Sequence, residues 1–293
     1  MAKELTLAEE IGRTVFTRFR KELWSPFVNA IHQYELIQPG DHIAVCISGG
    51  KDSMLMAKLM QMYQGIHEIP FEVTYLVMDP GYNEFNRKKI EENAKTLDIP
   101  ITIFETNIFA VANNQTRNPC YLCARMRRGH LYNAAKNLGC SKIALGHHLN
   151  DAIETVVMAM LNSSKLETII PKARSENFEG MELIRPLYRV KEDNIIRWCQ
   201  YNGLEFIQCA CRFTENAAAC GSGGGSKRKE AKELIRSLKE KNPEVEDNIF
   251  RSLHAVQMET FPGYKADGSL HSFTEDYNTN PTGKFTRNKS SEA

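Results

Sequence analysis

The chain has 293 residues, of which 42% are apolar, and its 37 Lys and Arg residues nearly balance its 36 Asp and Glu residues. This apolar content is enough to fill the core of one large α/β domain with extensions or of two average domains. The net charge of +1 excludes binding of nucleic acid through overall charge, so an RNA partner would need a local basic patch. No apolar run approaches the roughly 20 residues of a membrane span, and the N-terminus lacks the apolar region of a secretory signal. We therefore expect a cytoplasmic protein without a membrane partner.

The predicted elements begin with amphipathic helices over residues 7–35, which we expect Pro26 to break or bend. Short apolar runs then alternate with helical segments, a pattern typical of a doubly wound parallel sheet. We expect helices over 52–65, 84–97, 123–139, 150–161 and 192–203. The expected strands are 42–48, 71–79, 101–106, 142–146, 181–187 and 204–209.

The rest of the chain is lysine-rich over residues 226–258, where we expect a helix or a helix pair broken near Pro243. From about residue 266 onward Gly, Ser, Asn, Thr and Lys dominate, which indicates a loosely held tail. The fold class is thus α/β with helical extensions at both ends. The expected regions are 1–36 (N-terminal helices), 37–220 (nucleotide domain), 221–265 (basic helices) and 266–293 (tail).

The first chemical motif is SGGKDS, residues 48–53, which follows the first expected strand and opens the first helix of the alternating pattern. Two glycines let the backbone turn tightly, and the N–H groups of the turn and of the helix N-terminus then point to one place. Ser48, Lys51 and Ser53 add further donors. The motif matches neither the Walker loop nor the dinucleotide-binding fingerprint, but it is suited to a polyphosphate.

At SGGKDS the chain resembles the PP-loop ATP pyrophosphatases, which transfer AMP from ATP to an oxygen that is to be replaced. The segment GHHLNDAIET, residues 146–155, is similar to the H-H-x-D-D-x-x-[EQ]-T block of the tRNA-modifying members, although Asn150 stands where the first aspartate is usual. Helix capping and packing is the alternative interpretation of His147 and His148. The resemblance implies ATP with Mg²⁺ as ligands and catalytic roles for Lys51, Asp52 and Asp151. It implies nucleotide contacts from Ser48, Gly49, Gly50, Lys51, Asp52, Ser53, Asp79 and His147.

The cysteines are the second chemical feature, and eight of them in a chain without a secretory signal point to metal, cluster or thiol chemistry rather than to disulfides. Cys120 and Cys123 have C-x-x-C spacing in front of Arg125, Arg127 and Arg128. A helix N-terminus and nearby arginines favour the thiolate form that metals bind. Cys46, Cys140 and Cys199 occupy ordinary core or helix positions, and we assign them no chemistry.

The segment CYLCARMRRGHLY resembles the bacterial tRNA 2-thiocytidine synthetases, and the segment from Cys220 resembles the part of that family with a third essential cysteine. The resemblance implies that Cys120, Cys123 and Cys220 hold a [4Fe-4S] cluster with one open iron, and that Cys220 takes part in catalysis. Cys211 is the second candidate for the third ligand and Cys209 the third candidate. A zinc site made by the first two cysteines with Cys209 and Cys211, or a redox pair that passes a persulfide to Cys220, remains an alternative.

Basic patches supply candidate tRNA contacts at residues 125–128, at 226–232 and in the N-terminal helix, although such runs are more often solvated helix faces. The resemblance implies adenylation of a cytidine O2 in an anticodon loop, replacement of that oxygen by sulfur from a cysteine desulfurase or another donor, and a homodimer. Lysidine-type amination, uridine thiolation, desulfidation of small thiolated bases and a zinc-stabilised RNA-binding module remain alternatives.

Overall fold

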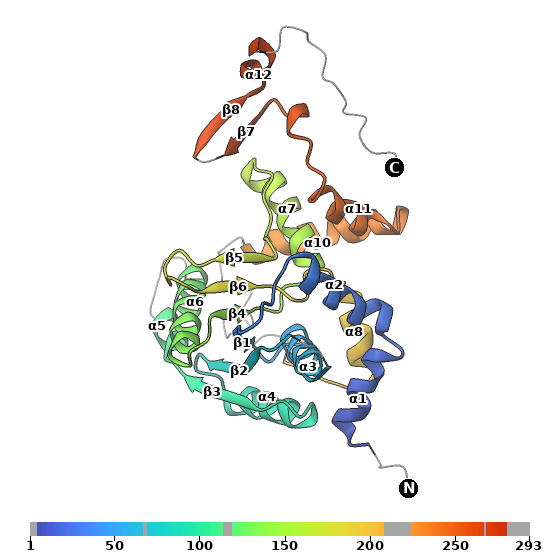
Figure 1. The fold of residues 1–293 in the computed structure, drawn as a ribbon, viewed down its shortest axis with the longest axis vertical. Coiled ribbons are helices and arrows are strands. Elements are labelled where there is room, and N and C mark those ends of the chain that lie inside the picture. The colour runs from blue at the N-terminus through green and yellow to red at the C-terminus, as the bar shows by residue number, and fades with distance from the viewer. Residues whose placement is uncertain (1–4, 67–68, 114–118, 208–223, 267, 280–293) are drawn as a thin grey trace. The chain divides into compact units, whose positions relative to one another are not determined.

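The computed structural model describes residues 5–66, 69–113, 119–207, 224–266 and 268–279, and divides into two compact units, Met1–Asn242 and Pro243–Ala293. A six-stranded sheet with the order β3-β2-β1-β4-β6-β5 forms the centre of the first unit (Figure 1). The strands are β1 (His42–Ile47), β2 (Glu72–Asp79), β3 (Ile101–Glu105), β4 (Lys142–Ala144), β5 (Lys172–Arg174) and β6 (Glu182–Ile184). Neighbouring strands are parallel except for β5 and β6, which confirms the expected α/β fold with a mostly parallel sheet.

Helices cover both faces of this sheet, as the unbroken apolar run of β1 indicates. Ile43, Val45 and Ile47 belong to one buried cluster, whereas Ala44 and Cys46, which point to the opposite face, belong to a second. The helices connected to the sheet are α3 (Lys51–Ile66), α4 (Glu84–Thr96), α5 (Ile108–Asn113), α6 (Pro119–Asn137), α7 (Leu149–Ser163) and α8 (Glu192–Tyr201). Figure 1 shows α3 and α6 on opposite sides of the sheet.

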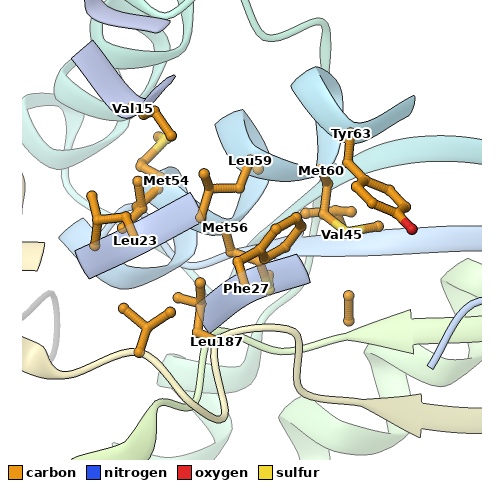
Figure 2. Close-up of a cluster of buried hydrophobic side chains, with 14 of the residues drawn as sticks. Val15, Leu23, Phe27, Val45, Met54, Met56, Leu59, Met60, Tyr63 and Leu187 are labelled. Atoms are coloured by element: carbon orange, nitrogen blue, oxygen red, sulfur yellow. The ribbon is translucent and has the colours of Figure 1, made fainter. Parts of the chain in front are cut away.

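The N-terminal elements complete the larger core on the α3 side. They are α1 (Leu7–Phe16), the π-helical segment η1 (Arg20–Trp24) and α2 (Ser25–Gln33). Figure 2 shows their side chains Val15, Leu23 and Phe27 close to Met54, Met56 and Leu59 of α3. All six side chains have an exposed fraction of 0%. The N-terminal region is therefore part of the packed core of the first unit.

The break between the N-terminal helices differs from the expectation at Pro26. The α-helical conformation ends at Phe16, and a π-helical turn leads into α2, where Pro26 lies in the first turn. A proline at this position removes no intrahelical hydrogen bond, because the first N–H groups of a helix have no carbonyl partner within it. Pro26 thus starts a helix rather than breaking one.

The predicted strand over 204–209 is wrong in its described part. Residues 204–207 pair with no strand, and Leu204, Phe206 and Ile207 instead pack against the larger core. Next to β6, the edge of the sheet is formed by β5, which the sequence analysis missed because its residues Lys172–Arg174 carry no apolar run. Residues 204–207 thus contribute apolar side chains to the core without pairing as a strand, whereas β5 pairs as a strand without an apolar run.

The lysine-rich region forms two helices, α10 (Gly224–Lys241) in the first unit and α11 (Val245–Ser252) in the second, which confirms the expected break near Pro243. The second unit continues with η2 (Met258–Thr260), the antiparallel hairpin β7 (Gly263–Ala266) and β8 (Ser269–Ser272), and α12 (Phe273–Thr279). Tyr264 and His271 stack across the hairpin with ring centroids 4.8 Å apart. Regular structure thus extends into the segment for which the composition predicts a loose tail. In the described part of the chain, no helix is both long and apolar enough to cross a membrane.

Candidate active site

The SGGKDS turn joins the carboxyl end of β1 to the start of α3. The Ser53 hydroxyl closes the turn, since its Oγ accepts a hydrogen bond from the Ser48 N–H at 3.1 Å and lies 3.0 Å from the Gly50 carbonyl oxygen, to which it donates. Gly49 has a φ of +84°, a conformation that residues with a Cβ rarely adopt. Because α3 begins at Lys51, the free N–H groups of its first turn face the loop and form a site for an anion.

The segment GHHLNDAIET packs directly against this turn through Gly146. A Cβ at residue 146 would lie 3.1 Å from the backbone nitrogen of Ser53 and 3.2 Å from the carbonyl carbon of Asp52. Gly146 follows β4, which pairs with β1 in parallel, so the carboxyl ends of both strands meet at this edge. The structure therefore brings together the two motifs that the resemblance associates with ATP.

His148 is the N-cap of α7, and its side chain forms a capping box with Asp151. The Asp151 Oδ2 accepts a hydrogen bond from the His148 N–H at 2.9 Å, and the His148 Nδ1 lies 3.4 Å from the Asp151 N–H. The capping interpretation thus applies to His148. Burial lowers the pKa of His147 to about 4, so this imidazole is neutral, and its Nδ1 is buried without a hydrogen bond to any described residue.

Lys51 lies between two carboxylates at the mouth of the turn. Its Nζ is 3.1 Å from the Asp52 carboxylate and 3.1 Å from Oε1 of Glu192, the first residue of α8. Asp52 in turn lies 3.8 Å from Nε2 of His148. Burial lowers the pKa of Lys51, but Asp52 and Glu192 outweigh it and raise the pKa above its ordinary value. The ammonium group is therefore charged and available to a phosphate.

The basic helix α10 contacts the same carboxylates from the other side. Arg228 lies 3.3 Å from Oδ1 of Asp151 and 3.9 Å from Oε2 of Glu154, and Lys232 lies 2.5 Å from Oε2 of Glu192. Burial, followed by the charge of Asp151, raises the pKa of Glu154 to about 7. Burial has the same effect on Glu192, but the nearby ammonium groups lower its pKa to about 2.

Asp79, at the end of β2, is held by a separate set of contacts. Its Oδ1 accepts hydrogen bonds from the N–H groups of Gly81 at 2.8 Å and Tyr82 at 2.7 Å, and its Oδ2 accepts one from Arg87 at 2.8 Å. Burial opposes ionisation, yet these donors lower the pKa of Asp79. The carboxylate shapes the turn after β2, and its role in nucleotide binding stays a prediction.

The cysteines predicted as cluster ligands fall partly inside the described residues. Cys120 and Cys123 lie three positions apart at the start of α6, and Cys123 is partly buried. Because α6 follows β3 and leads back to the start of β4, its N-terminus belongs at the carboxyl edge of the parallel sheet, on the same side as the SGGKDS turn. Three and four positions apart are neighbouring places on a helix, so this spacing suits two ligands of one group.

The predicted third ligands Cys220, Cys211 and Cys209 lie outside the described residues. Among the residues that are described, no three His, Cys, Asp or Glu side chains are grouped closely enough to hold a metal ion. Burial raises the pKa of Cys46 and of Cys199 to about 12, so both thiols stay protonated at neutral pH. The structure thus agrees with the assignment of no chemistry to these two cysteines.

The sequence analysis missed Glu192 and Glu154 as site residues, and it gave Lys232 only as part of the basic run 226–232. Glu154 stands at the [EQ] position of the quoted block, so the motif itself contains a signal for it. Glu192 starts a helix just after the last parallel strand, and an acidic residue at such a place is a candidate for a ligand site. The basic run contains Lys232, but nothing in the sequence distinguishes it from its neighbouring lysines as the partner of Glu192.

Comparisons with known proteins agree with this geometry. Residues 19–212 match the PP-loop domain family. The tRNA-cytidine(32) 2-sulfurtransferase of Vibrio parahaemolyticus is 32% identical over 261 residues, which cover 88% of this chain and 84% of the relative. The enzyme of the same name from Anaeromyxobacter dehalogenans strain 2CP-C is 31% identical over 258 residues, 87% of this chain and 84% of the relative.

Among solved structures, the U34-tRNA thiolase NcsA from Methanococcus maripaludis with its [4Fe-4S] cluster has a similar fold. The TM-score is 0.62 at 20% identity, with 85% of this chain and 83% of the other covered. The family assignment rests on the sequence relatives, and the similarity to this solved structure supports only the fold. The chain belongs to the PP-loop family and, within it, to the tRNA-cytidine(32) 2-sulfurtransferase family, as the motifs around Ser48–Ser53 and Cys120–Cys123 indicate.

Proposed function

We propose that this protein is an ATP-dependent tRNA sulfurtransferase that replaces O2 of cytidine 32 by sulfur and so forms 2-thiocytidine. The observation that carries the proposal is the contact of Gly146 with residues 52 and 53, which builds one nucleotide site from the two PP-loop motifs. The family membership of the chain gives the substrate and the position. It does not favour amination, uridine thiolation, desulfidation or a noncatalytic zinc module, the alternatives that the motifs leave open.

The residues of the turn fit a bound ATP. The first N–H groups of α3 and the ammonium of Lys51 face the place where phosphate charge develops, and they stabilise it as cytidine O2 is adenylated. Ser48 and Ser53 shape the turn through their hydroxyls. Asp52 is a candidate for Mg²⁺ because its buried Oδ1 accepts no hydrogen bond from the described residues, although it lies 3.1 Å from Nζ of Lys51 and 3.8 Å from Nε2 of His148. Asp151 is the second carboxylate in reach, although Arg228 pairs with it in this structure.

The cluster site is proposed from chemistry and from the family resemblance. A [4Fe-4S] cluster with one open iron supplies a place for the incoming sulfur, and thiolates are the ligands that such clusters use. We assign Cys120 and Cys123 as two ligands and Cys220 as the third, with Cys211 and then Cys209 as the other candidates. The N-terminus of α6 and the neighbouring Arg125, Arg127 and Arg128 favour the thiolate form of the first two.

We further propose the tRNA anticodon loop as the partner, a cysteine desulfurase or another sulfur donor, a homodimer and a cytoplasmic location. For the domain organisation we propose the four regions 1–36, 37–220, 221–265 and 266–293. The exposed residues Lys227 and Lys229 of α10 support the tRNA contact, because they place positive charge beside Asp151 and its partner Arg228.

The test of the function is a two-part assay on the anaerobically reconstituted protein. With ATP, Mg²⁺, a sulfur donor and unmodified tRNA, pyrophosphate is expected to appear only when tRNA is present, and nucleoside mass spectrometry is expected to find 2-thiocytidine at position 32. Asp151→Asn is expected to lower both signals by at least about 100-fold, because it removes a carboxylate of the site. Pyrophosphate release that does not depend on tRNA, or sulfur found in a uridine, would contradict the proposal.

A further inference from the structure

Glu192 has an unusual position, because its two carboxylate oxygens contact lysines from two different parts of the chain. Oε1 lies 3.1 Å from Nζ of Lys51 in the SGGKDS turn, and Oε2 lies 2.5 Å from Nζ of Lys232 in α10. The side chain is only 13% exposed. The backbone N–H of Glu192 donates a hydrogen bond of 2.9 Å to Oδ1 of the buried Asn150, which fixes the residue beside the start of α7.

We propose that Glu192 is a positioning residue whose carboxylate pairs with Lys51 of the nucleotide turn and with Lys232 of α10. Binding of ATP at the turn then strengthens the attachment of α10 to the site. The proposal rests on the proposed function, since it takes the turn as the ATP site. Glu192 lies outside the motifs on which the resemblance to the family depends, and Lys232 enters them only as one residue of the basic segment after Cys220.

The physical reason is competition for Lys51. A polyphosphate in the turn attracts the Lys51 ammonium more strongly than one carboxylate does, so Lys51 turns away from Glu192 when ATP binds. The Glu192 carboxylate then pairs with Lys232 alone, and the repulsion between the ammonium groups of Lys51 and Lys232 becomes weaker. The ion pair between α8 and α10 therefore becomes stronger in the ATP-bound state.

The consequence concerns the position of α10. The helix starts at Gly224 and is held at a second point by the pair of Arg228 with Asp151. A tighter α10 therefore keeps its basic residues beside the nucleotide turn while ATP is bound. Because coupling of two sites is reciprocal, docking of α10 also raises the affinity for ATP.

Hydrogen exchange on the full-length, cluster-reconstituted protein tests the inference without measuring activity. A nonhydrolysable ATP analogue with Mg²⁺ is expected to slow exchange of the α10 amides about tenfold in the wild type, a typical size for coupling between sites. In Glu192→Gln the analogue is expected to bind, as measured by calorimetry, but to leave α10 exchange unchanged. Gln keeps the shape of the side chain and removes the charge.

Asp193→Asn is the matched control. Asp193 is the next residue of α8 and pairs with Lys239 of the same helix α10 at 2.7 Å, but among the described residues it forms no ion pair or hydrogen bond with the SGGKDS turn. This variant loses an ion pair to α10 as well, yet it is expected to keep the ATP-dependent slowing. The coupling is refuted if Glu192→Gln and the wild type gain the same protection, or if Asp193→Asn loses it to the same extent as Glu192→Gln.

Steady-state kinetics give an independent readout. Glu192→Gln is expected to lower kcat by about 10- to 100-fold through misplacement of Lys51 and α10, while KM for ATP does not rise, because the lost charge repelled the nucleotide. A rise in KM with unchanged kcat would contradict the positioning role. Failure of the wild type to bind ATP would overturn both the proposed function and this inference, whereas ATP binding without α10 protection overturns the inference alone.

Discussion

Gly49→Ala tests the construction of the nucleotide turn. Gly49 has φ +84°, and a Cβ there would lie 2.6 Å from Cγ1 of Ile90 and 2.7 Å from Cδ1 of Ile207. A left-handed conformation costs an L-residue about 1–2 kcal/mol, and overpacking of this kind costs about 1–3 kcal/mol. We therefore expect Gly49→Ala to lower the free energy of unfolding by about 2–5 kcal/mol.

Gly40→Ala separates the two contributions. Gly40 has nearly the same φ, +83°, but a Cβ there would meet no atom within 4 Å. Its substitution is expected to cost only the backbone contribution of about 1–2 kcal/mol. Urea unfolding followed by tryptophan fluorescence measures both variants, because Trp24 and Trp198 are buried in the core of the first unit. Equal losses in the two variants would show that Ile90 and Ile207 do not restrict the turn, and would refute the reasoning.

Three further predictions concern charge and the cluster. Burial raises the pKa of Glu154 from 4.5 to about 7, so the folded state binds its proton more tightly than the unfolded state does. The free energy of unfolding of the wild type, relative to that of Glu154→Gln, should therefore fall by about 3 kcal/mol as the pH rises from about 4.5 to about 7. Urea unfolding at pH 5 and pH 8 measures this difference, and the same difference at both pH values would contradict the prediction. Cys123→Ser should reduce the iron content from roughly four atoms per chain to a small fraction of that value. Cys140→Ala, a substitution in the core, should keep the iron content of the wild type. Iron analysis and visible absorption of the purified variants measure the difference, and equal iron contents would contradict the prediction. Replacing both Lys227 and Lys229 by Ala should lower the slope of log affinity for tRNA against log salt by about 0.7 per lysine in filter binding, and an unchanged slope would remove these residues from the RNA contact.

Much of the sheet could be predicted because burial on both faces leaves a strong pattern. Residues 43–47 form an unbroken apolar run, and all of them are buried in the structure. The turn at Ser48–Ser53 was recognisable for a related reason, since two glycines between a buried strand and a helix have few uses other than a close backbone turn. Local rules of this kind depend on neighbouring residues only.

Other features depend on contacts between distant parts of the chain. Lys51 and Glu192 are 141 positions apart, and no local pattern marks one as the partner of the other. Residues 204–207 carry the apolar composition of a strand, yet they pack against the larger core and pair with no described strand. Conversely, β5 forms on backbone pairing with β6 alone, without an apolar run. In both segments tertiary packing overrides the local preference.

The balance of charge around the turn explains why a divalent cation belongs to this site. The carboxylates of Asp52, Asp151 and Glu192 already engage the available cations Lys51, Arg228 and Lys232. A polyphosphate brings several more negative charges, and when it takes Lys51 the carboxylate of Asp52 loses its ammonium partner. A buried carboxylate left without a cation is costly, whereas Mg²⁺ binds carboxylate and phosphate oxygens together. The buried Oδ1 of Asp52 accepts no hydrogen bond from the described residues and has Lys51 as its ammonium neighbour at 3.1 Å, so it is the atom for which the structure gives the strongest reason to expect the metal.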